Sequence, residues 1–136
     1  MKVSYSNSIA YKVLQRIEAL RGAVVLRSDV ADLAEPRQIS RAFKQLVDEG
    51  RLAKLGYGVY AKLIRSQLLK SSYLKEGFLP VMREALDKLN VKWELSDEEK
   101  AYQAGKSTQV PVNPVIKLKT RFRRRLRYQD MELKVE

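Results

Sequence analysis

The stretch that most constrains the fold is PRQISRAFKQLVDEG, which begins at Pro36 and ends at Gly50. Proline suits the first turn of a helix because its missing N–H would have no partner there, and glycine suits the left-handed position after a last turn. The apolar residues between these two ends recur at helical spacing and share one face, which is formed by Ile39, Ala42, Phe43, Leu46 and Val47. The stretch therefore predicts an amphipathic helix whose apolar face lies on a core.

The opposite face of this predicted helix carries guanidinium, ammonium and amide groups. Helical geometry places on it Arg37, Arg41, Lys44 and the late Asp48, with Gln38 and Gln45 on one flank and Ser40 on the other. Arginine and glutamine side chains pair bidentately with guanine and adenine edges in a major groove, so this face predicts a recognition helix. The alternative interpretation is an ordinary solvated face, because any surface helix of a basic protein presents arginine, lysine and glutamine to water.

Two short β-prone runs follow Gly50 and favour the recognition helix. Residues 52–55 and 59–61 are joined by Gly56-Tyr57-Gly58, which is typical of a tight hairpin. Helix, glycine and hairpin, with a helix-turn-helix pattern upstream, is the order of elements in a winged helix-turn-helix domain. We therefore predict such a domain, with a wing at the hairpin.

The residues before Pro36 supply the other elements of this predicted domain. An amphipathic helix is expected to begin at a cap, either Ser4 or Ser6, and a brief strand is expected over residues 23–26. Ser28 is expected to cap a short second helix over residues 29–33, in which two early aspartates suit the helix dipole.

The middle of the chain is predicted to be helical. Apolar residues at helical spacing predict helices over residues 63–74 and 80–89, and the first of them is either a link or a dimer surface. A capping-box pattern at Ser96 predicts a short helix that ends at Gly105. Trp93, just before that helix, is expected to anchor a core.

The last part of the chain alternates basic and apolar residues. After a loop with Pro111 and Pro114, strands are expected over residues 115–119, 121–128 and 131–135. If Phe122, Leu126 and Tyr128 face a core, the other face of the middle strand carries Arg121, Arg123, Arg125 and Arg127. Such a row of arginines could bind along a phosphate backbone or an acidic protein. One or two charges are enough to protect an edge strand from pairing with another strand, so four on one face favour a binding role.

Together these elements predict an α+β fold: a winged helix-turn-helix domain over residues 1–61, then helices and a small antiparallel sheet with a basic strand over residues 62–136. The chain of 136 residues is long enough for one domain, or for one domain with a small appendage. Its formal net charge of +11 predicts a polyanionic partner. The excess lies at both ends, with +4 over residues 1–61, +1 over residues 62–105 and +6 over residues 106–136.

The chain contains no cysteine and no histidine. Disulfides and thiolate metal sites are therefore excluded, and the commonest metal ligand and general base are missing. The Gly-Lys-Ser-Thr run at Gly105 lacks the first glycine and the spacing of a phosphate-binding loop. We expect no enzymatic activity, no metal and no cofactor. Since there is neither an apolar run of about 18 residues nor a secretory leader, we expect a cytoplasmic protein that does not contact membranes.

Two stretches of the sequence resemble one protein family. ISRAFKQLVDEGRLAKLGYGVYAK is similar to the winged-helix core of AbiEi-type antitoxins, the regulators of type IV toxin–antitoxin and abortive-infection systems. AGKSTQVPVNP, followed by KLKTRFRRRLRY, is similar to the second segment of that family. The resemblance implies a DNA-binding protein that represses its own operon at inverted repeats and is often paired with a nucleotidyltransferase toxin. It places the recognition-helix positions that would contact bases on residues 38–45, and it places the wing on residues 54–58.

The sequence departs from this family in two ways. The wing tip is Tyr57, where the family often has a basic residue, so stacking or a phosphate hydrogen bond must replace an arginine in the minor groove. The chain is also shorter than two-domain members, whose large C-terminal domain is tied to toxin neutralisation. From the resemblance to this family we therefore infer DNA binding for this chain before toxin neutralisation.

Our first hypothesis is a sequence-specific DNA-binding transcriptional regulator that acts as a dimer or in pairs on repeated half-sites. The expected base-reading side chains are Arg37, Gln38, Arg41 and Gln45, and the expected phosphate contacts include Lys44, Lys54, Arg124 and the other C-terminal arginines. The alternative is a protein-interaction module whose basic C-terminal sheet binds an acidic protein such as a toxin. RNA is a third candidate, less favoured because aromatic and basic residues do not alternate on a clear stacking face.

Overall fold

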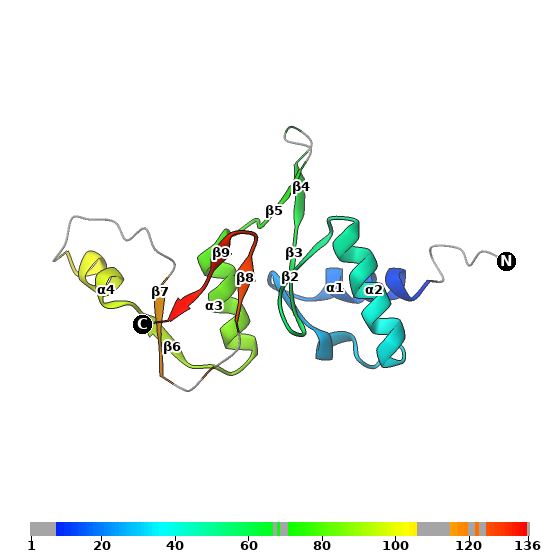
Figure 1. The fold of residues 1–136 in the computed structure, drawn as a ribbon, viewed down its shortest axis with the longest axis horizontal. Helices are drawn as coiled ribbons and strands as arrows, with labels where there is room; N and C mark the ends of the chain where they lie inside the picture. Colours follow the sequence, from blue (N-terminus) through cyan, green and yellow to red (C-terminus); the bar gives the residue numbers. More distant parts are fainter. Residues whose placement is uncertain are drawn as a thin grey trace.

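The structure is a computed structural model of the chain, and it describes residues 8–66, 68, 71–105, 115–119, 122 and 125–135. Over these residues the fold is α+β, with helices packed around small sheets in which antiparallel pairing predominates. Figure 1 shows an elongated molecule. The described residues contain no helix with both the length and the apolar character needed to cross a membrane.

The first helix, α1 (Ile9–Ala19), begins at Ser8, whose Oγ accepts a hydrogen bond from the Tyr11 amide at 3.0 Å. Ser8 is the cap because its extended backbone aims the hydroxyl at that amide. The prediction of a cap at Ser4 or Ser6 is therefore wrong, and both of those residues lie outside the described part of the chain.

The predicted strand over residues 23–26 is confirmed as β1 (Val24–Leu26), but the helix after it differs from the prediction. It is a single 3-10 turn, η2 (Arg27–Val30), and Ser28 lies inside it. The Asp29 carboxylate holds this turn by accepting a hydrogen bond from the Leu26 amide at 2.8 Å. The predicted serine cap is therefore wrong: the residue before the turn is Leu26, and its amide is bound by the Asp29 carboxylate.

The predicted amphipathic helix is confirmed as α2 (Pro36–Asp48), with proline in its first turn. Gly50 follows it with a φ of +75°, the left-handed conformation that ends a helix at low cost in glycine. The predicted hairpin is also confirmed, as β2 (Leu52–Gly56) and β3 (Val59–Lys62) with a turn at Tyr57 and Gly58. Strand β1 pairs antiparallel with β3, which gives the sheet order β1-β3-β2.

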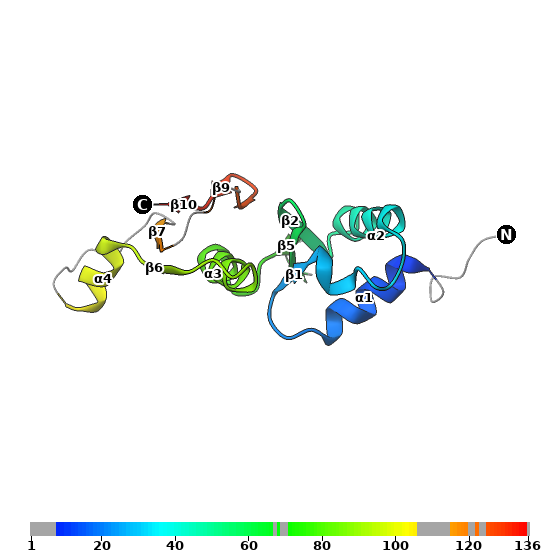
Figure 2. The ribbon, with the colours of Figure 1, turned by 90° about the horizontal axis from the view of Figure 1, so that it is seen from below.

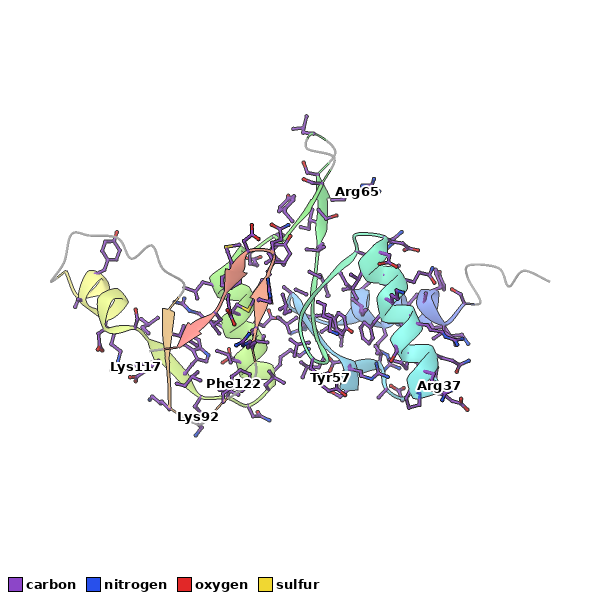
Figure 3. All side chains as sticks on the ribbon, viewed as in Figure 1. Arg37, Tyr57, Arg65, Lys92, Lys117 and Phe122 are labelled. Atoms are coloured by element: carbon purple, nitrogen blue, oxygen red, sulfur yellow. The ribbon has the colours of Figure 1, made fainter. Side chains whose placement is uncertain are left out.

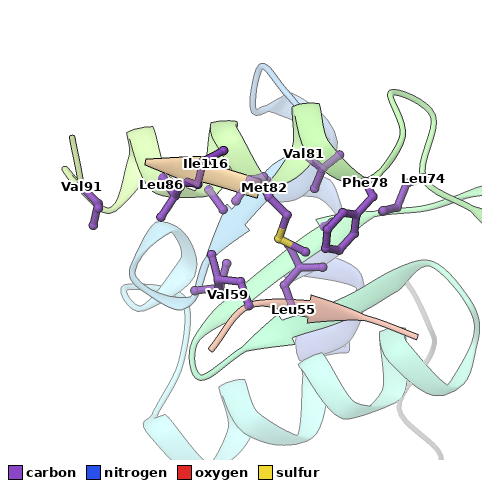
Figure 4. Close-up of a cluster of buried hydrophobic side chains, with 13 residues drawn as sticks. Leu55, Val59, Leu74, Phe78, Val81, Met82, Leu86, Val91 and Ile116 are labelled. Atoms are coloured by element: carbon purple, nitrogen blue, oxygen red, sulfur yellow. The ribbon is translucent and has the colours of Figure 1, made fainter. Parts of the chain in front are cut away.

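Both faces of this central sheet are buried, each by a different set of helices. One face lies against α1 and α2 in a core formed by Ala10, Val13, Ile17, Val25, Val30, Ile39, Ala42, Phe43, Leu46, Leu52 and Tyr60. The other face lies against α3 (Phe78–Lys88) and later segments, and Figure 4 shows this second core, in which Leu55 and Val59 meet Phe78, Met82 and Leu86. Successive strand residues alternate between the cores, Val24 and Val25 for example, because side chains alternate across a sheet.

Two polar side chains of α3 occupy the outer edge of β1. The Glu84 carboxylate accepts hydrogen bonds from the amides of Ala23 and Val24. Lys88 Nζ donates to the Val24 carbonyl at 2.8 Å and to Asp29 Oδ2 at 2.9 Å. The helix thereby satisfies backbone groups that an edge strand would otherwise leave open to pairing.

The prediction of a helix over residues 63–74 is wrong. The described residues there form a two-stranded antiparallel hairpin, β4 (Ile64–Ser66) and β5 (Ser71–Tyr73), which we call the arm. Figure 1 shows the arm projecting from the body of the molecule. Its base is fixed by the hydrogen bond from Ser72 Oγ to the Gly50 carbonyl at 2.8 Å. The apolar residues have helical spacing, but Leu68 is 96% exposed, so they do not form a buried helical face.

The second half also contains the predicted helices α3 and α4 (Asp97–Gln103). Its sheet combines β6 (Trp93–Leu95) and β7 (Val115–Leu118) in antiparallel pairing with β10 (Lys134–Val135), which pairs with β7 in parallel. The half-buried Trp93 packs against the second core and donates from Nε1 to Asp87 Oδ1 at 2.7 Å. The loop with Pro111 and Pro114 lies outside the described residues.

The predicted middle strand of the C-terminal part is short in the structure. Within the described residues it is β8 (Arg127–Tyr128), which pairs with β9 (Met131–Glu132) across a turn at residues 129–130. The buried Leu126 confirms an inward-facing position. This segment crosses the β2–β3 hairpin closely, since a Cβ added at Gly56 would lie 2.6 Å from the Arg125 carbonyl oxygen.

Candidate nucleic-acid interface

A groove of about 600 Å³ runs between α2 and the β2–β3 hairpin. We call it the α2–hairpin groove, and its lining consists of Arg27, Pro36, Ser40, Lys44, Val47, Lys54, Tyr57, Gly58 and Tyr60. Ser40, Lys44, Lys54 and Tyr57 were all predicted from the sequence as site residues. The structure thus brings helix and hairpin residues of the predicted site to one groove.

A buried pair of aromatic rings fixes the distance between the two walls of the groove. Phe43 on α2 stacks on Tyr60 of β3, with ring centroids 4.2 Å apart and planes within 8° of parallel. Lys44 follows Phe43 in the helix, and Lys54 is the ladder partner of Tyr60. Burial raises the pKa of the Tyr60 phenol, an effect that the nearby Arg27 opposes, so the hydroxyl is protonated at neutral pH.

Arg27 is a groove residue that the sequence did not indicate. Its Nη2 donates to the Pro36 carbonyl at 2.6 Å, and its backbone amide donates to the Gly58 carbonyl at 2.9 Å. It therefore joins the end of β1 to the start of α2 and to the hairpin turn. The only available signal was a basic residue directly after a predicted strand, which is too common to identify a site.

The outer face of α2 carries cations that have no partner among the described residues. Arg37, Arg41 and Lys44 are exposed, as is Lys54 on the hairpin, and among the described residues none of them forms a hydrogen bond or an ion pair through its side chain. In Figure 3, Arg37 and Tyr57 both lie on the lower side of the view, and Tyr57 is 83% exposed. The four cationic side chains, Arg37, Arg41, Lys44 and Lys54, are therefore exposed to an external anion.

The two predicted glutamines have partners within the chain. Gln38 Oε1 accepts from the Glu35 amide at 3.2 Å, which helps to cap α2. Gln45 Nε2 donates to Glu49 Oε1 at 3.0 Å, and the other oxygen of Glu49 accepts from Arg51 Nε at 3.1 Å. Both glutamines would have to exchange these contacts to read a base. The C-terminal end of α2 is acidic as predicted, with Glu49 following Asp48.

An ion pair outside the groove positions the elements that support α2. Arg16 of α1 donates to both carboxylate oxygens of Asp32, at 2.9 and 3.0 Å, and also to the Asp29 carbonyl. The hydrogen bond with Arg16 lowers the pKa of Asp32, and the same bond raises the pKa of Arg16. This contact joins α1 to the segment that leads into α2.

The described C-terminal arginines lie outside the α2–hairpin groove. Arg125 Nε is 3.7 Å from Glu132 Oε1, and Arg127 Nη2 donates to the Gln129 carbonyl at 3.3 Å. Figure 2 shows β9 on the same long side of the molecule as α2, with α1 and α3 on the other side. This surface is nearly neutral where it is described, since Asp130 and Glu132 accompany the two arginines. Three predicted site residues lie outside the described residues: Arg121, Arg123 and Arg124.

The groove combines cationic groups, a serine hydroxyl and an exposed tyrosine, which together suit a phosphodiester backbone better than a small neutral ligand. In the described part of the chain, no cluster of three or more acidic residues could hold a metal ion. Comparisons of the chain with known protein families, with curated proteins and with solved structures gave no match.

Proposed function

We propose that the protein is a sequence-specific DNA-binding regulator in which α1, η2, α2 and the β2–β3 hairpin act as a winged helix-turn-helix. The observation that carries the proposal is the α2–hairpin groove, in which cations from two separate elements converge. The groove lies beside a helix face whose arginines have no partner in the described part of the chain. A solvated surface helix accounts for exposed cations on α2. It does not account for Lys54 and Arg27 facing the same groove.

In the proposed complex, α2 enters the major groove of duplex DNA. Arg37 and Arg41 reach base edges from the N-terminal two thirds of the helix, and the acidic end at Asp48 points away from the phosphates. One phosphate strand lies in the α2–hairpin groove, held by Lys44 and Lys54. Phosphate contacts fix the position of a protein on DNA, and base contacts determine which sequence it prefers.

The resemblance to AbiEi-type antitoxins supports a more specific form of this proposal. The protein would bind inverted repeats upstream of its own operon in the cytoplasm and repress transcription. A toxin encoded beside it is the expected protein partner. This form is tested by using the protein's own upstream DNA as the probe.

The deciding experiment is fluorescence anisotropy with a labelled upstream fragment and a scrambled competitor across a salt series. A regulator should bind the native fragment at least about 10³-fold more tightly than the scrambled one, with affinity that falls steeply as salt rises. A steep salt dependence without preference would indicate a nonspecific nucleic-acid binder. No binding at moderate salt would contradict the proposal. The basic surface would then be expected to bind an acidic protein.

Variants of neighbouring residues on α2 should separate base reading from phosphate binding. Arg41→Ala should weaken binding to the native fragment by about 1–3 kcal/mol and relax the preference at one base pair. Lys44→Ala should weaken binding to native and scrambled DNA alike and reduce the salt slope by about one.

Lys12→Ala is the matched control for these variants, because Lys12 is an exposed lysine on α1, away from the groove. It should leave both affinities nearly unchanged. Equal losses on native and scrambled DNA from Arg41→Ala would remove this arginine from the base-reading role.

A further inference from the structure

The 3-10 turn η2 is bound by helices from both halves of the chain. Its Asp29 carboxylate accepts hydrogen bonds from the Leu26 amide at 2.8 Å and from Lys88 Nζ of α3 at 2.9 Å, both through Oδ2. The Asp29 carbonyl accepts from Arg16 Nη1 of α1 at 3.0 Å. Helices α1 and α3 cover opposite faces of the central sheet, so the turn is held between them.

Arg27, the first residue of this turn, connects it to both walls of the α2–hairpin groove. Its Nη2 donates to the Pro36 carbonyl at the start of α2, at 2.6 Å, and its amide donates to the Gly58 carbonyl in the hairpin turn, at 2.9 Å. A shift of η2 would therefore disturb both contacts at once. The position of the turn thus bears on the angle between α2 and the hairpin.

The ion pair between Lys88 and Asp29 is suited to hold the turn in one position. The two side chains are 26% and 23% exposed, and partly buried charges are screened by solvent and salt less than charges on the surface. Lys88 Nζ also donates to the Val24 carbonyl at 2.8 Å, so one ammonium group joins α3 to both the turn and β1. Removal of either partner would leave the other charge partly buried without compensation.

We propose that Lys88 is a positioning residue for DNA recognition, which acts through Asp29 and Arg27 on the two walls of the α2–hairpin groove. Lys88 is not among the described residues that line this groove, and α3 lies on the other face of the sheet from α2. The second half of the chain would thus contribute to recognition without contact with DNA.

The proposed role predicts a loss of sequence preference rather than a uniform loss of affinity. Specific binding requires α2 in the major groove and the hairpin on the backbone at the same time, so it depends on the angle between them. Nonspecific binding depends mainly on the number of neutralised phosphates. A groove with loosened walls keeps its cations, and so it should still bind scrambled DNA.

The first test compares Lys88 variants in the anisotropy assay with native and scrambled DNA. Lys88→Met should lower the ratio of native to scrambled affinity by about tenfold, and Lys88→Arg should recover most of this loss because arginine can also pair with the carboxylate. The salt slope should stay at the wild-type value in both variants. A slope reduced by about one would overturn the proposal, since it would show that Lys88 itself contacts a phosphate.

Lys62→Met is the matched control, because Lys62 is another half-buried lysine that binds a backbone carbonyl beside the same sheet. Its Nζ donates to the Leu20 carbonyl at 2.7 Å, and the described lining of the α2–hairpin groove does not include it. This variant should keep the wild-type affinity ratio, whatever it does to the free energy of unfolding in urea. An equal ratio for Lys88→Met and Lys62→Met would overturn the proposal.

Asp29→Asn removes the same ion pair from its other end, and its amide oxygen can still accept from the Leu26 amide. It should reproduce the loss of preference, and it keeps the proposal testable if Lys88→Met does not fold. The double variant should lose little more than the stronger of the two single variants, because both remove one interaction. Additive losses would show that Lys88 does not act through Asp29 and would reject the proposed route.

A spin-label measurement tests the geometry of the groove without DNA. The chain contains no cysteine, so Arg41→Cys on α2 and Tyr57→Cys on the hairpin turn supply two exposed positions for nitroxide labels. Lys88→Met should shift or broaden the distribution of distances between the labels, and Lys62→Met should leave it unchanged. A distribution that Lys88→Met leaves at the wild-type shape would overturn the proposal.

The role of Lys88 in recognition rests on the proposed function, but the two can fail separately. If the wild-type chain does not prefer its upstream DNA, the proposed function fails, and the spin labels still decide whether Lys88 positions the groove walls. If the wild-type chain shows this preference and Lys88→Met behaves like Lys62→Met in both measurements, only the role of Lys88 is rejected.

Discussion

Replacing Phe43 by alanine is expected to lower the free energy of unfolding by about 3–5 kcal/mol, the range for truncating a large buried aromatic side chain. Phe43 has no exposed surface, and its ring stacks on Tyr60 with centroids 4.2 Å apart. The substitution removes this aromatic contact and leaves a cavity under α2. The unfolding temperature should fall by on the order of 10 °C or more.

The same variant should weaken DNA binding even at temperatures at which it is folded, because the stacked rings set the distance between the groove walls. Urea denaturation measures the stability, and anisotropy with the upstream fragment measures the binding. Tyr57→Ala is the stability control, since it removes an aromatic ring that is 83% exposed and should cost less than about 1 kcal/mol. A stability loss of less than about 1 kcal/mol for Phe43→Ala would contradict the packing described for α2.

Replacing Gly56 by alanine is expected to destabilise the protein by about 2–3 kcal/mol, because the new methyl group has no space. Its Cβ would lie 2.6 Å from the Arg125 carbonyl oxygen and 3.1 Å from Leu126 Cδ2. The nearer of these atoms belongs to the backbone, which cannot turn aside as the end of a side chain can. The C-terminal segment must therefore move away from the hairpin.

Hydrogen exchange should locate this movement. The Leu133 amide donates to the Leu126 carbonyl at 2.9 Å, and its exchange should accelerate in the Gly56→Ala variant. Gly77→Ala is the matched control, since Gly77 has a φ of +87° but no atom within 4 Å of an added Cβ. That change should cost about 1–2 kcal/mol from backbone strain alone and leave the Leu133 amide protected. Equal exchange rates in both variants would show that the C-terminal segment is not held against Gly56.

Local sequence patterns were sufficient to predict the elements that form the α2–hairpin groove. Pro36 and Gly50 mark the two ends of one helix, and the flanking glycines of Tyr57 mark the turn of the hairpin. Once these elements are known, the period of the helix determines that Ser40 and Lys44 face outward. The convergence of Lys44 with Lys54 required the packing of α2 on the sheet, which only the structure shows.

The arm was predicted incorrectly because both its hydrophobic spacing and its composition favour a helix. Residues 63–74 contain one β-branched residue, Ile64, against seven leucine, arginine, glutamine and lysine residues, which are good helix formers. Leu68 matched the helical period but contacts solvent rather than a core. Arg27 and the approach of Arg125 to Gly56 depend on residues far apart in the sequence, for which no local pattern exists.

The central sheet, with both of its faces buried, affects how the protein folds during synthesis. Once Lys62 has left the ribosome, α1 and α2 can cover one face, but Leu55 and Val59 on the other face await α3 and Leu126. At typical translation speeds this interval lasts on the order of seconds, long enough for an uncovered apolar sheet to bind chaperones or to aggregate. The nascent chain therefore depends on translation speed and chaperone supply in a way that the finished protein does not.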